Sequence, residues 1–301
     1  MTRSAVGEAM SRLRTSPTYA RLDPACAFDG LFVPTRGAKR GRLLVEPRRF
    51  GNVEIGFQGF EQLGADDQSI LLALTAQLGI EHRAIDSNSK GEIGAELRNT
   101  LALSRDDGSP LATKRVTLRN LLIDAGYHPD TSTTRAMQSL NRLRATQIRE
   151  IDHATGWDRA CNLISIAINH LTQEIYVAAN PRLTAAVFHG QHVRVSLSER
   201  HELETDVAKI LHCWLCSNVR LGQTLGNGNG AHLDTLAPHI WGTAWDCLSR
   251  QSRSQKRGLL RDGLDEINDK TCERWGNGGW AIEQTSSGLI MISRPVRLPA
   301  L

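Results

Sequence analysis

Two stretches of the sequence place long hydrogen-bond donors on one face of a predicted helix. In residues 131–146, Met137, Leu140 and Leu143 share one side of a helix that turns 100° per residue. The opposite side carries the candidate DNA contacts Arg135, Gln138 and Arg142, joined by Arg149 if the helix extends that far. Arg can bond guanine, and Gln adenine, through paired hydrogen bonds in the major groove. The pattern is typical of a recognition helix; a solvated helix with solubilising Arg side chains is the alternative.

The second stretch is more strongly basic. Its candidate DNA contacts are Arg250, Arg253, Gln255, Lys256, Arg257 and Arg261, and the first acid after them is Asp262. Leu260, Leu264 and Ile267 follow at helical spacing and are expected to pack. Arg253 and Arg257 lie at nearly the same azimuth as these apolar residues, so they reach DNA only if the helix projects beyond the core. Cations without a local acid repel one another, which favours a polyanionic partner over a merely solvated surface.

The elements around the first stretch have the order of a winged helix. Residues 116–125 form a predicted helix that ends at Gly126, and Thr131, Ser132 and Thr133 are candidate N-caps for the next helix. Residues 147–152 and 162–168 then form a predicted strand pair around Gly156, followed by a third strand at 174–181. Upstream, we expect strands at 42–47 and 52–57 and a helix at 66–78.

The second half repeats this plan. We expect a strand at 192–197, helices at 199–219, 232–241 and 252–268, and a hairpin at 280–295. The sequence therefore predicts an α+β protein with two tandem winged-helix domains, at residues 26–180 and 181–301, after a flexible N-terminal arm at residues 1–25. Wing residues Arg159 and Arg294 are expected to contact phosphates. The helix at 199–219 and the strand at 192–197 are expected to form an inter-domain or dimer face.

Composition is that of an ordinary globular protein. The 301 residues are 40% hydrophobic and 23% charged, with a net charge of +4, and the length suits about two domains. The longest apolar runs are broken by charges and the N-terminus has no apolar signal segment, so we expect a cytoplasmic protein without membrane contact. Cys213 and Cys216 form a CxxC without a second pair, which favours buried core thiols; a metal or redox pair is the alternative.

No catalytic constellation is found. The sequence has no GxxxxGK[ST] motif, which argues against a P-loop motor, and no His-apolar-His pair of the kind that rolling-circle initiators use. The acid pairs Asp66-Asp67 and Asp106-Asp107 fall at a helix start and in a turn, so a catalytic metal role for them is disfavoured. We therefore expect no enzyme activity, no metal and no cofactor.

Several separated blocks, in the same order, resemble the RepC replication initiators of IncQ-type plasmids over about residues 26–297. They are GLFVPTRGAKRGRLLVEP (30–47), LGADDQSILLAL (63–74), IYVAANPRLTAAVFHGQHVRVSL (175–197), DVAKILHCWLC followed by LDTLAPHIW, and GWAIEQTSSGLIMISRP (279–295). The resemblance implies tandem winged helices that bind the direct repeats (iterons) of double-stranded plasmid origin DNA. It also implies opening of adjacent AT-rich DNA and recruitment of a replicative helicase and primase. The chain differs from the family in the basic helix of its second half and in the Asn/Gly loop before that helix. This difference affects which iteron sequence is bound rather than the role of the protein.

Two other functions remain open. A winged-helix transcriptional repressor would also bind DNA, but would usually carry a ligand-sensing or dimerisation domain in place of the second winged helix. A primase or nickase would show metal-dependent cleavage or primer synthesis on origin DNA. A homodimer is compatible with each of the binding functions.

Overall fold

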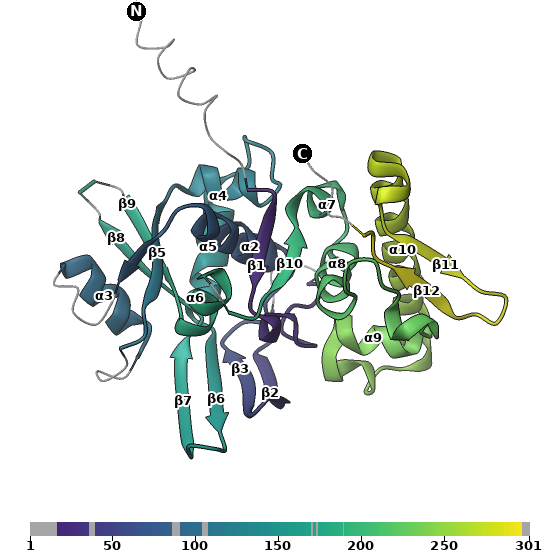
Figure 1. The fold of residues 1–301 in the computed structure, drawn as a ribbon, viewed down its shortest axis with the longest axis horizontal. Coiled ribbons are helices and arrows are strands. Elements are labelled where there is room, and N and C mark those ends of the chain that lie inside the picture. Colours follow the sequence, from purple (N-terminus) through teal and green to yellow (C-terminus); the bar gives the residue numbers. More distant parts are fainter. Residues whose placement is uncertain are drawn as a thin grey trace, which may run out of the picture.

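A helix with buried residues on every side lies at the centre of the molecule. This helix, α2 (Ala65–Ile80), has the sequence ADDQSILLALTAQLGI and buries 13 of its 16 residues. It packs against β1, α4, α5, α6 and α8 (Figure 1). Its first turn is closed by Asp67, whose carboxylate accepts the Gly64 N–H at 2.8 Å. A helix without a polar face has to be covered on all sides, so elements from both halves of the chain gather around it.

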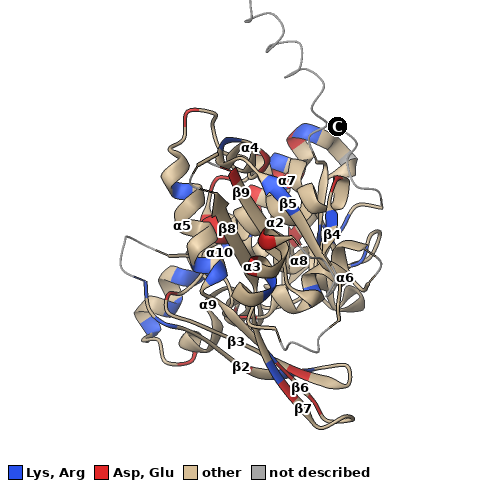
Figure 2. Ribbon diagram, turned by 90° about the vertical axis from the view of Figure 1, so that its left-hand side faces the viewer, with Lys and Arg blue, Asp and Glu red and all other residues tan. Residues whose placement is uncertain are grey.

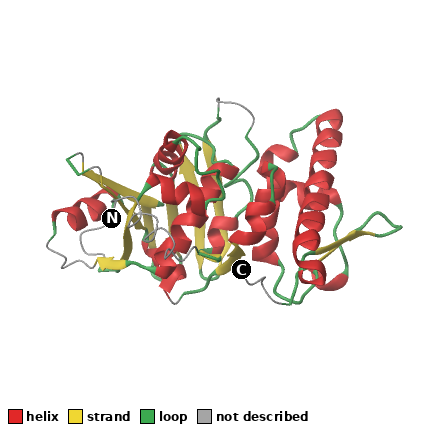
Figure 3. Cartoon of the chain, turned by 90° about the horizontal axis from the view of Figure 1, so that it is seen from above, coloured by secondary structure: helices red, strands yellow, loops and turns green. Residues whose placement is uncertain are grey.

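The computed structural model describes residues 17–35, 40–85, 91–103, 108–169, 171–172, 174–188 and 190–296. The helices in this part of the chain are α2, α3 (Glu92–Thr100), α4 (Leu118–Asp124), α5 (Thr133–Arg144), α6 (Pro181–Phe188), α7 (Leu197–Glu202), α8 (Asp206–Asn218), α9 (Leu233–Trp241) and α10 (Arg250–Trp275). Short 3-10 turns are η1 (Pro24–Ala27), η2 (Leu225–Gly228), η3 (Gly242–Trp245) and η4 (Gly276–Gly278). Figure 3 shows that the C-terminal half is mainly helical, with one projecting hairpin.

The strands of the first half form two antiparallel sheets. One has the order β2-β3-β6-β7, built from β2 (Leu43–Phe50), β3 (Val53–Gly59), β6 (Gln147–Asp152) and β7 (Trp157–Asn162). The other has the order β4-β5-β9-β8, built from β4 (Arg83–Ile85), β5 (Leu111–Val116), β9 (Glu174–Ala179) and β8 (Ile164–Asn169). In the C-terminal half, β11 (Ala281–Gln284) and β12 (Ile290–Ser293) form the projecting hairpin.

The two halves are joined by backbone pairing and by a shared core. β1 (Tyr19–Leu22) pairs antiparallel with β10 (Val193–Ser196). Gly30 and Gly242 meet so closely that a Cβ on Gly242 would lie 2.9 Å from the Gly30 Cα. Arg200 of α7 is 2% exposed and donates to the Ser69 hydroxyl of α2 at 3.1 Å. One cluster of buried apolar residues runs through both halves.

The structure confirms the α+β class and most of the expected elements. The helices expected at 66–78, 116–125, 131–146, 232–241 and 252–268, and the strand expected at 192–197, are present within a few residues. Ser132 is the observed N-cap of α5, since its hydroxyl accepts the Thr134 N–H. The last helix extends further than expected, to Trp275.

Three expectations about elements were wrong. The helix expected at 199–219 is two helices, because α7 ends in the extended residue Leu203 and Thr205 caps α8. Residues 147–168 hold three strands rather than two, and β7, not β8, pairs with β6. The arm expected at residues 1–25 contains β1; residues 1–16 lie outside the described part of the chain. The position of the expected domain boundary at 180–181 stays a prediction.

None of the described helices is long and apolar enough to cross a membrane.

Candidate nucleic-acid interface

Helix α5 is held by its neighbours so that one side stays exposed. Gly126, at φ +83°, ends the preceding helix α4, and Ser132 then caps α5. Ala136, Leu140 and Leu143 are buried against α2 and α4. Helix α5 lies on the left of the view in Figure 2, where Lys and Arg positions are blue.

Two of the predicted contacts on α5 are free to meet a ligand. Arg135 and Gln138 are both exposed. The Arg135 guanidinium lies 4.6 Å from the centre of the Tyr127 ring, so the helix–turn–helix itself holds this side chain. The sequence interpretation of one packed and one donor-bearing face thus matches the positions of these residues.

Arg142, the third predicted contact on α5, is anchored to the protein. Its guanidinium lies 2.8 Å from the Asp67 carboxylate and 3.6 Å from that of Asp66, and its side chain is only 14% exposed. Arg40 binds the same two acids, at 2.5 Å from Asp67 and 3.1 Å from Asp66. Partial burial would raise the pKa of Asp66, but the two guanidinium groups outweigh it and hold that pKa below its usual value. Arg142 therefore fixes α5 to the start of α2 before it can contact any ligand.

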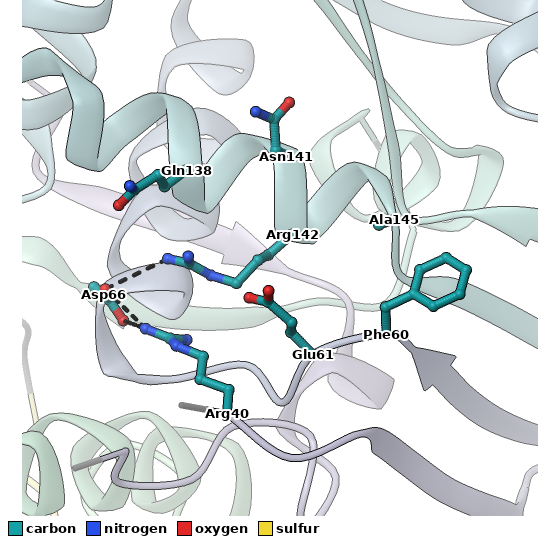
Figure 4. A pocket seen from close by; sticks show the side chains of 8 residues that line it. All are labelled: Arg40, Phe60, Glu61, Asp66, Gln138, Asn141, Arg142 and Ala145. Atoms are coloured by element: carbon teal, nitrogen blue, oxygen red, sulfur yellow. Dashed lines mark hydrogen bonds and ion pairs between the residues drawn. The ribbon is translucent and has the colours of Figure 1, made fainter. Parts of the chain in front are cut away.

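A cleft of about 490 Å³ opens beside this ion-pair cluster (Figure 4). Its lining residues are Arg40, Phe60, Glu61, Asp66, Gln138, Asn141, Arg142 and Ala145. Figure 4 shows Arg40 and Arg142 converging on Asp66, while Phe60 lies below Ala145 at the C-terminal end of α5. The cleft combines an aromatic ring, two amides and neutralised guanidinium groups.

The β6–β7 hairpin carries the next two predicted contacts. Arg149 lies on β6 and not on α5, because the helix ends at Arg144. Its guanidinium donates to the Asp158 carboxylate of β7 at 2.9 Å, and both side chains are about half exposed. Arg159 is exposed, with its guanidinium 5.2 Å from the Trp157 ring centre. Both cations are at the surface of the hairpin that follows α5.

In the C-terminal half, α10 begins at Arg250, and the hydroxyl of Ser249 caps it by accepting the Ser252 N–H. Leu260, Leu264 and Ile267 are buried, as the sequence predicts. The exposed members of the predicted set are Arg250, Gln255 and Arg261. Within the described residues, neither Arg250 nor Arg261 has an ion-pair partner.

The other three cations of the predicted set on α10 lie against the protein. Arg253 and Lys256 lie over the rings of Trp245 and Trp241, at 5.9 and 4.6 Å from the ring centres. Arg257 donates two hydrogen bonds to Asp234, at the start of α9. Its hydrogen bonds hold the pKa of Asp234 below its usual value. The prediction from sequence therefore overestimated the unpaired positive charge of α10, because it considered only acids within the helix.

Arg294 is not a surface residue. It is 6% exposed, and its guanidinium donates to the backbone carbonyls of Cys216, Val219 and Arg194 at 2.7, 2.9 and 2.8 Å. The expectation that it contacts phosphate is wrong for this conformation, because every one of these bonds points into the protein. Arg294 instead fastens the end of β12 to α8 and β10.

Sequence reasoning missed four residues that the fold brings to the α5 face. Asn141 and Arg144 are exposed on α5 itself, while Arg40 and Phe60 come from segments far upstream. The positions of Asn141 and Arg144, three and six residues after Gln138, could have signalled the two α5 residues. Nothing in the local pattern could place Arg40 and Phe60 beside α5, since tertiary packing brings them there.

Among the described residues, one cluster offers ligand atoms for a metal: Glu199, His212 and Cys216, all buried. His212 Nε2 lies 2.7 Å from Glu199 Oε2 and 3.7 Å from Cys216 Sγ. Two ligands on one tetrahedral zinc ion lie about 3.3 Å apart for bonds near 2.0 Å, so the His–Glu contact is a hydrogen bond in geometry. Cys213 and Cys216 are free and buried, which confirms the predicted burial of both thiols.

The chain is similar to one known protein family. The family described as Replication protein C (RepC) matches residues 14–295. No match was found among curated proteins.

Proposed function

The chain belongs to the replication protein C (RepC) family of plasmid replication initiators, and from this premise we propose that it binds the direct repeats of its plasmid's origin sequence-specifically. The observation that carries the proposal is the pair of helices α5 and α10, each with exposed donors and each followed by a hairpin.

We propose that each half contains a winged helix. In the first half α2, α4 and α5 pack on one another and lead into the β6–β7 hairpin; in the second, α8, α9 and α10 do so and lead into β11–β12. Three helices followed by a hairpin are the parts of a winged helix. In this arrangement α5 and α10 are the recognition helices.

The two recognition helices then enter successive major grooves of one repeat, about 34–36 Å apart along the duplex. Arg135 and Gln138 of α5, with Arg250, Gln255 and Arg261 of α10, are the exposed groups that meet the DNA. Arg149 and Arg159 of the hairpin contact backbone phosphates. Arg253, Lys256 and Arg257 bind DNA only after leaving their present contacts with Trp245, Trp241 and Asp234. Arg142 acts indirectly, because it fixes the position of α5.

Binding of several copies along the repeats strains the neighbouring AT-rich duplex, since bending DNA costs free energy that depends on its sequence. Opening of that segment exposes single strands for a replicative helicase and primase. The protein itself acts as a binding protein with no metal and no cofactor.

The test measures equilibrium binding to origin repeats and to a scrambled duplex of equal length, with fluorescence anisotropy as the readout, at physiological salt. We expect a preference of about a thousandfold or more, with Gln138→Ala and Arg250→Ala each weakening specific binding. Arg83→Ala is the matched control, because Arg83 is an exposed cation on β4, on the opposite side of Figure 2 from α5. Equal binding to both duplexes that disappears as salt rises would contradict the proposal.

A further inference from the structure

Phe60 is the most exposed aromatic side chain among the described residues. It follows the last residue of β3 and is 86% exposed, against 59% for Trp157. Burying a Phe side chain stabilises a protein, and the exposed position of Phe60 forgoes that stabilisation. Single exposed apolar residues are common, so the exposure of Phe60 carries weight only through what lies around it.

Phe60 lines the cleft beside α5, together with Gln138 and Asn141 of that helix and Ala145, the residue that caps its C-terminal end. These three residues are spaced three and four apart, so they follow one side of the helix. All are exposed, as is Phe60. The methyl group of Ala145 and the ring of Phe60, which lie one above the other in Figure 4, extend the polar face of α5 with an apolar end.

The charges of the cleft disfavour a phosphate. The Arg40 and Arg142 guanidinium groups are already paired with Asp66 and Asp67, at distances of 2.5–3.6 Å. Glu61, which is exposed, adds a negative charge to the lining. A neutral group with donors, acceptors and an apolar part suits this cleft better than an anion does.

An A·T base pair has those properties in the major groove. Adenine offers an acceptor and a donor, which an Asn or Gln amide bonds together, and thymine offers its methyl group to an apolar side chain. We propose that the cleft is a subsite for an A·T pair, in which the thymine methyl lies against Phe60 and Ala145 and the adenine is bonded by Gln138 or Asn141. This inference rests on the proposed function, since it requires α5 to lie in the major groove.

The experiment removes one methyl group from the DNA and one ring from the protein. Each thymine of an origin repeat is replaced in turn by deoxyuridine, and the Kd of each duplex is measured by fluorescence anisotropy. Burying one methyl group is worth about 0.8 kcal/mol, which is about fourfold in Kd. We expect the wild type to lose about fourfold at one position of the repeat, and Phe60→Ala to bind the thymine and uracil duplexes there equally.

Trp157→Ala is the matched control, because it removes the other strongly exposed aromatic side chain and should retain the fourfold methyl effect. Phe60→Ala is expected to fold normally since the ring is at the surface, and its thermal unfolding checks this. Specific binding without any methyl effect, or a methyl effect that survives in Phe60→Ala, would overturn the A·T subsite and leave the proposed function standing. Loss of all preference for origin DNA in the wild type would overturn the proposed function and the subsite with it.

Discussion

Arg142, which the sequence predicted to contact DNA, has a structural role within the protein. Its guanidinium bonds the fully buried carboxylate of Asp67. We expect Arg142→Ala to lower the free energy of unfolding by about 1.5–3 kcal/mol, since a hydrogen bond to a charged group is lost. Gln138→Ala, on the exposed side of the same helix, should change stability by less than about 0.5 kcal/mol. Urea denaturation of both variants measures the difference; equal stabilities would contradict the anchoring role.

The buried pair of Glu199 and His212 is held in its charged form by the residues around it. Burial would lower the pKa of His212, but Cys216 and the Glu199 carboxylate outweigh it and raise the pKa to about 9. Burial would raise the pKa of Glu199, but hydrogen bonds from His212 and Trp280 lower it. The pair is therefore charged through the neutral pH range.

This pair predicts a pH dependence of stability. A raised pKa in the folded state gives stability that is complete below the ordinary pKa of 6.5 and is lost as the pH rises through about 9. The lowered pKa of Glu199 gives stability that is present above pH 4.5 and is lost as the pH falls. We expect the free energy of unfolding to decline between about pH 6.5 and 9, and His212→Gln to remove most of the decline in this range. Above pH 9 the buried Cys213 thiol, whose pKa burial raises to about 12, lowers the stability of both proteins. His128→Gln, at an exposed position, is the control that should leave the decline unchanged.

For single residues, the sequence predicted which side chains of a helix are exposed better than it predicted their contacts with other elements. Arg135 and Gln138 lie where helical spacing placed them, because exposure on α5 follows from the position of Leu140 and Leu143. Arg294 could not be assigned, since the carbonyl groups that bind it belong to β10 and α8. Spacing along one element carries no information about partners from another.

Among the elements, α10 has a charge that depends on its neighbour α9. Arg257 is paired with Asp234 of α9, so one cation of the basic helix is neutralised from outside it. We expect Asp234→Asn to release this cation and to tighten DNA binding at low salt. The slope of log K against log salt should become steeper by up to about 0.9, the value for one additional phosphate contact.

Asp265→Asn is the matched control for this change, because Asp265 is an exposed acid in the C-terminal half of α10. It alters the net charge by the same amount at a position away from the basic half. An identical steepening in both variants would indicate a general charge effect rather than a contact by Arg257.

Elements with a strong local signal were predictable, and those defined by pairing were not. The apolar run of α2 and the Gly126 and Ser132 signals around α5 gave these helices within a few residues. The identity of the strand that pairs with β6 could not be predicted, because β7 is exposed along most of its length and has no apolar alternation. The break between α7 and α8 was missed because buried Leu203 continues the helical spacing.

For the whole molecule, the shared core decides whether the halves can exist apart. β1 of the first half pairs with β10 of the second, and Arg200 of the second half donates to Ser69 of α2. We expect fragments 1–180 and 181–301 to remain largely unfolded when expressed singly, because each would expose a surface that the other covers.

Circular dichroism and thermal unfolding of the fragments check this expectation, and the full chain should unfold in one transition. Co-expression of the two fragments is the control, since it restores the covering surfaces without the covalent link. Two fragments that each unfold cooperatively on their own would show that the halves are independent folding units.

The pairing of β1 with β10 also orders events during synthesis. Arg21 of β1 donates to the Val187 carbonyl, 166 residues further along the chain. At about 5–20 residues per second, a ribosome needs roughly 8–30 s to make that interval. During the later part of this time α2 (Ala65–Ile80) has already been made, while α8, one of its covering helices, has not. We therefore expect the uncovered apolar surface of α2 to attract chaperones, and folding to be completed only after residues 193–196 have emerged.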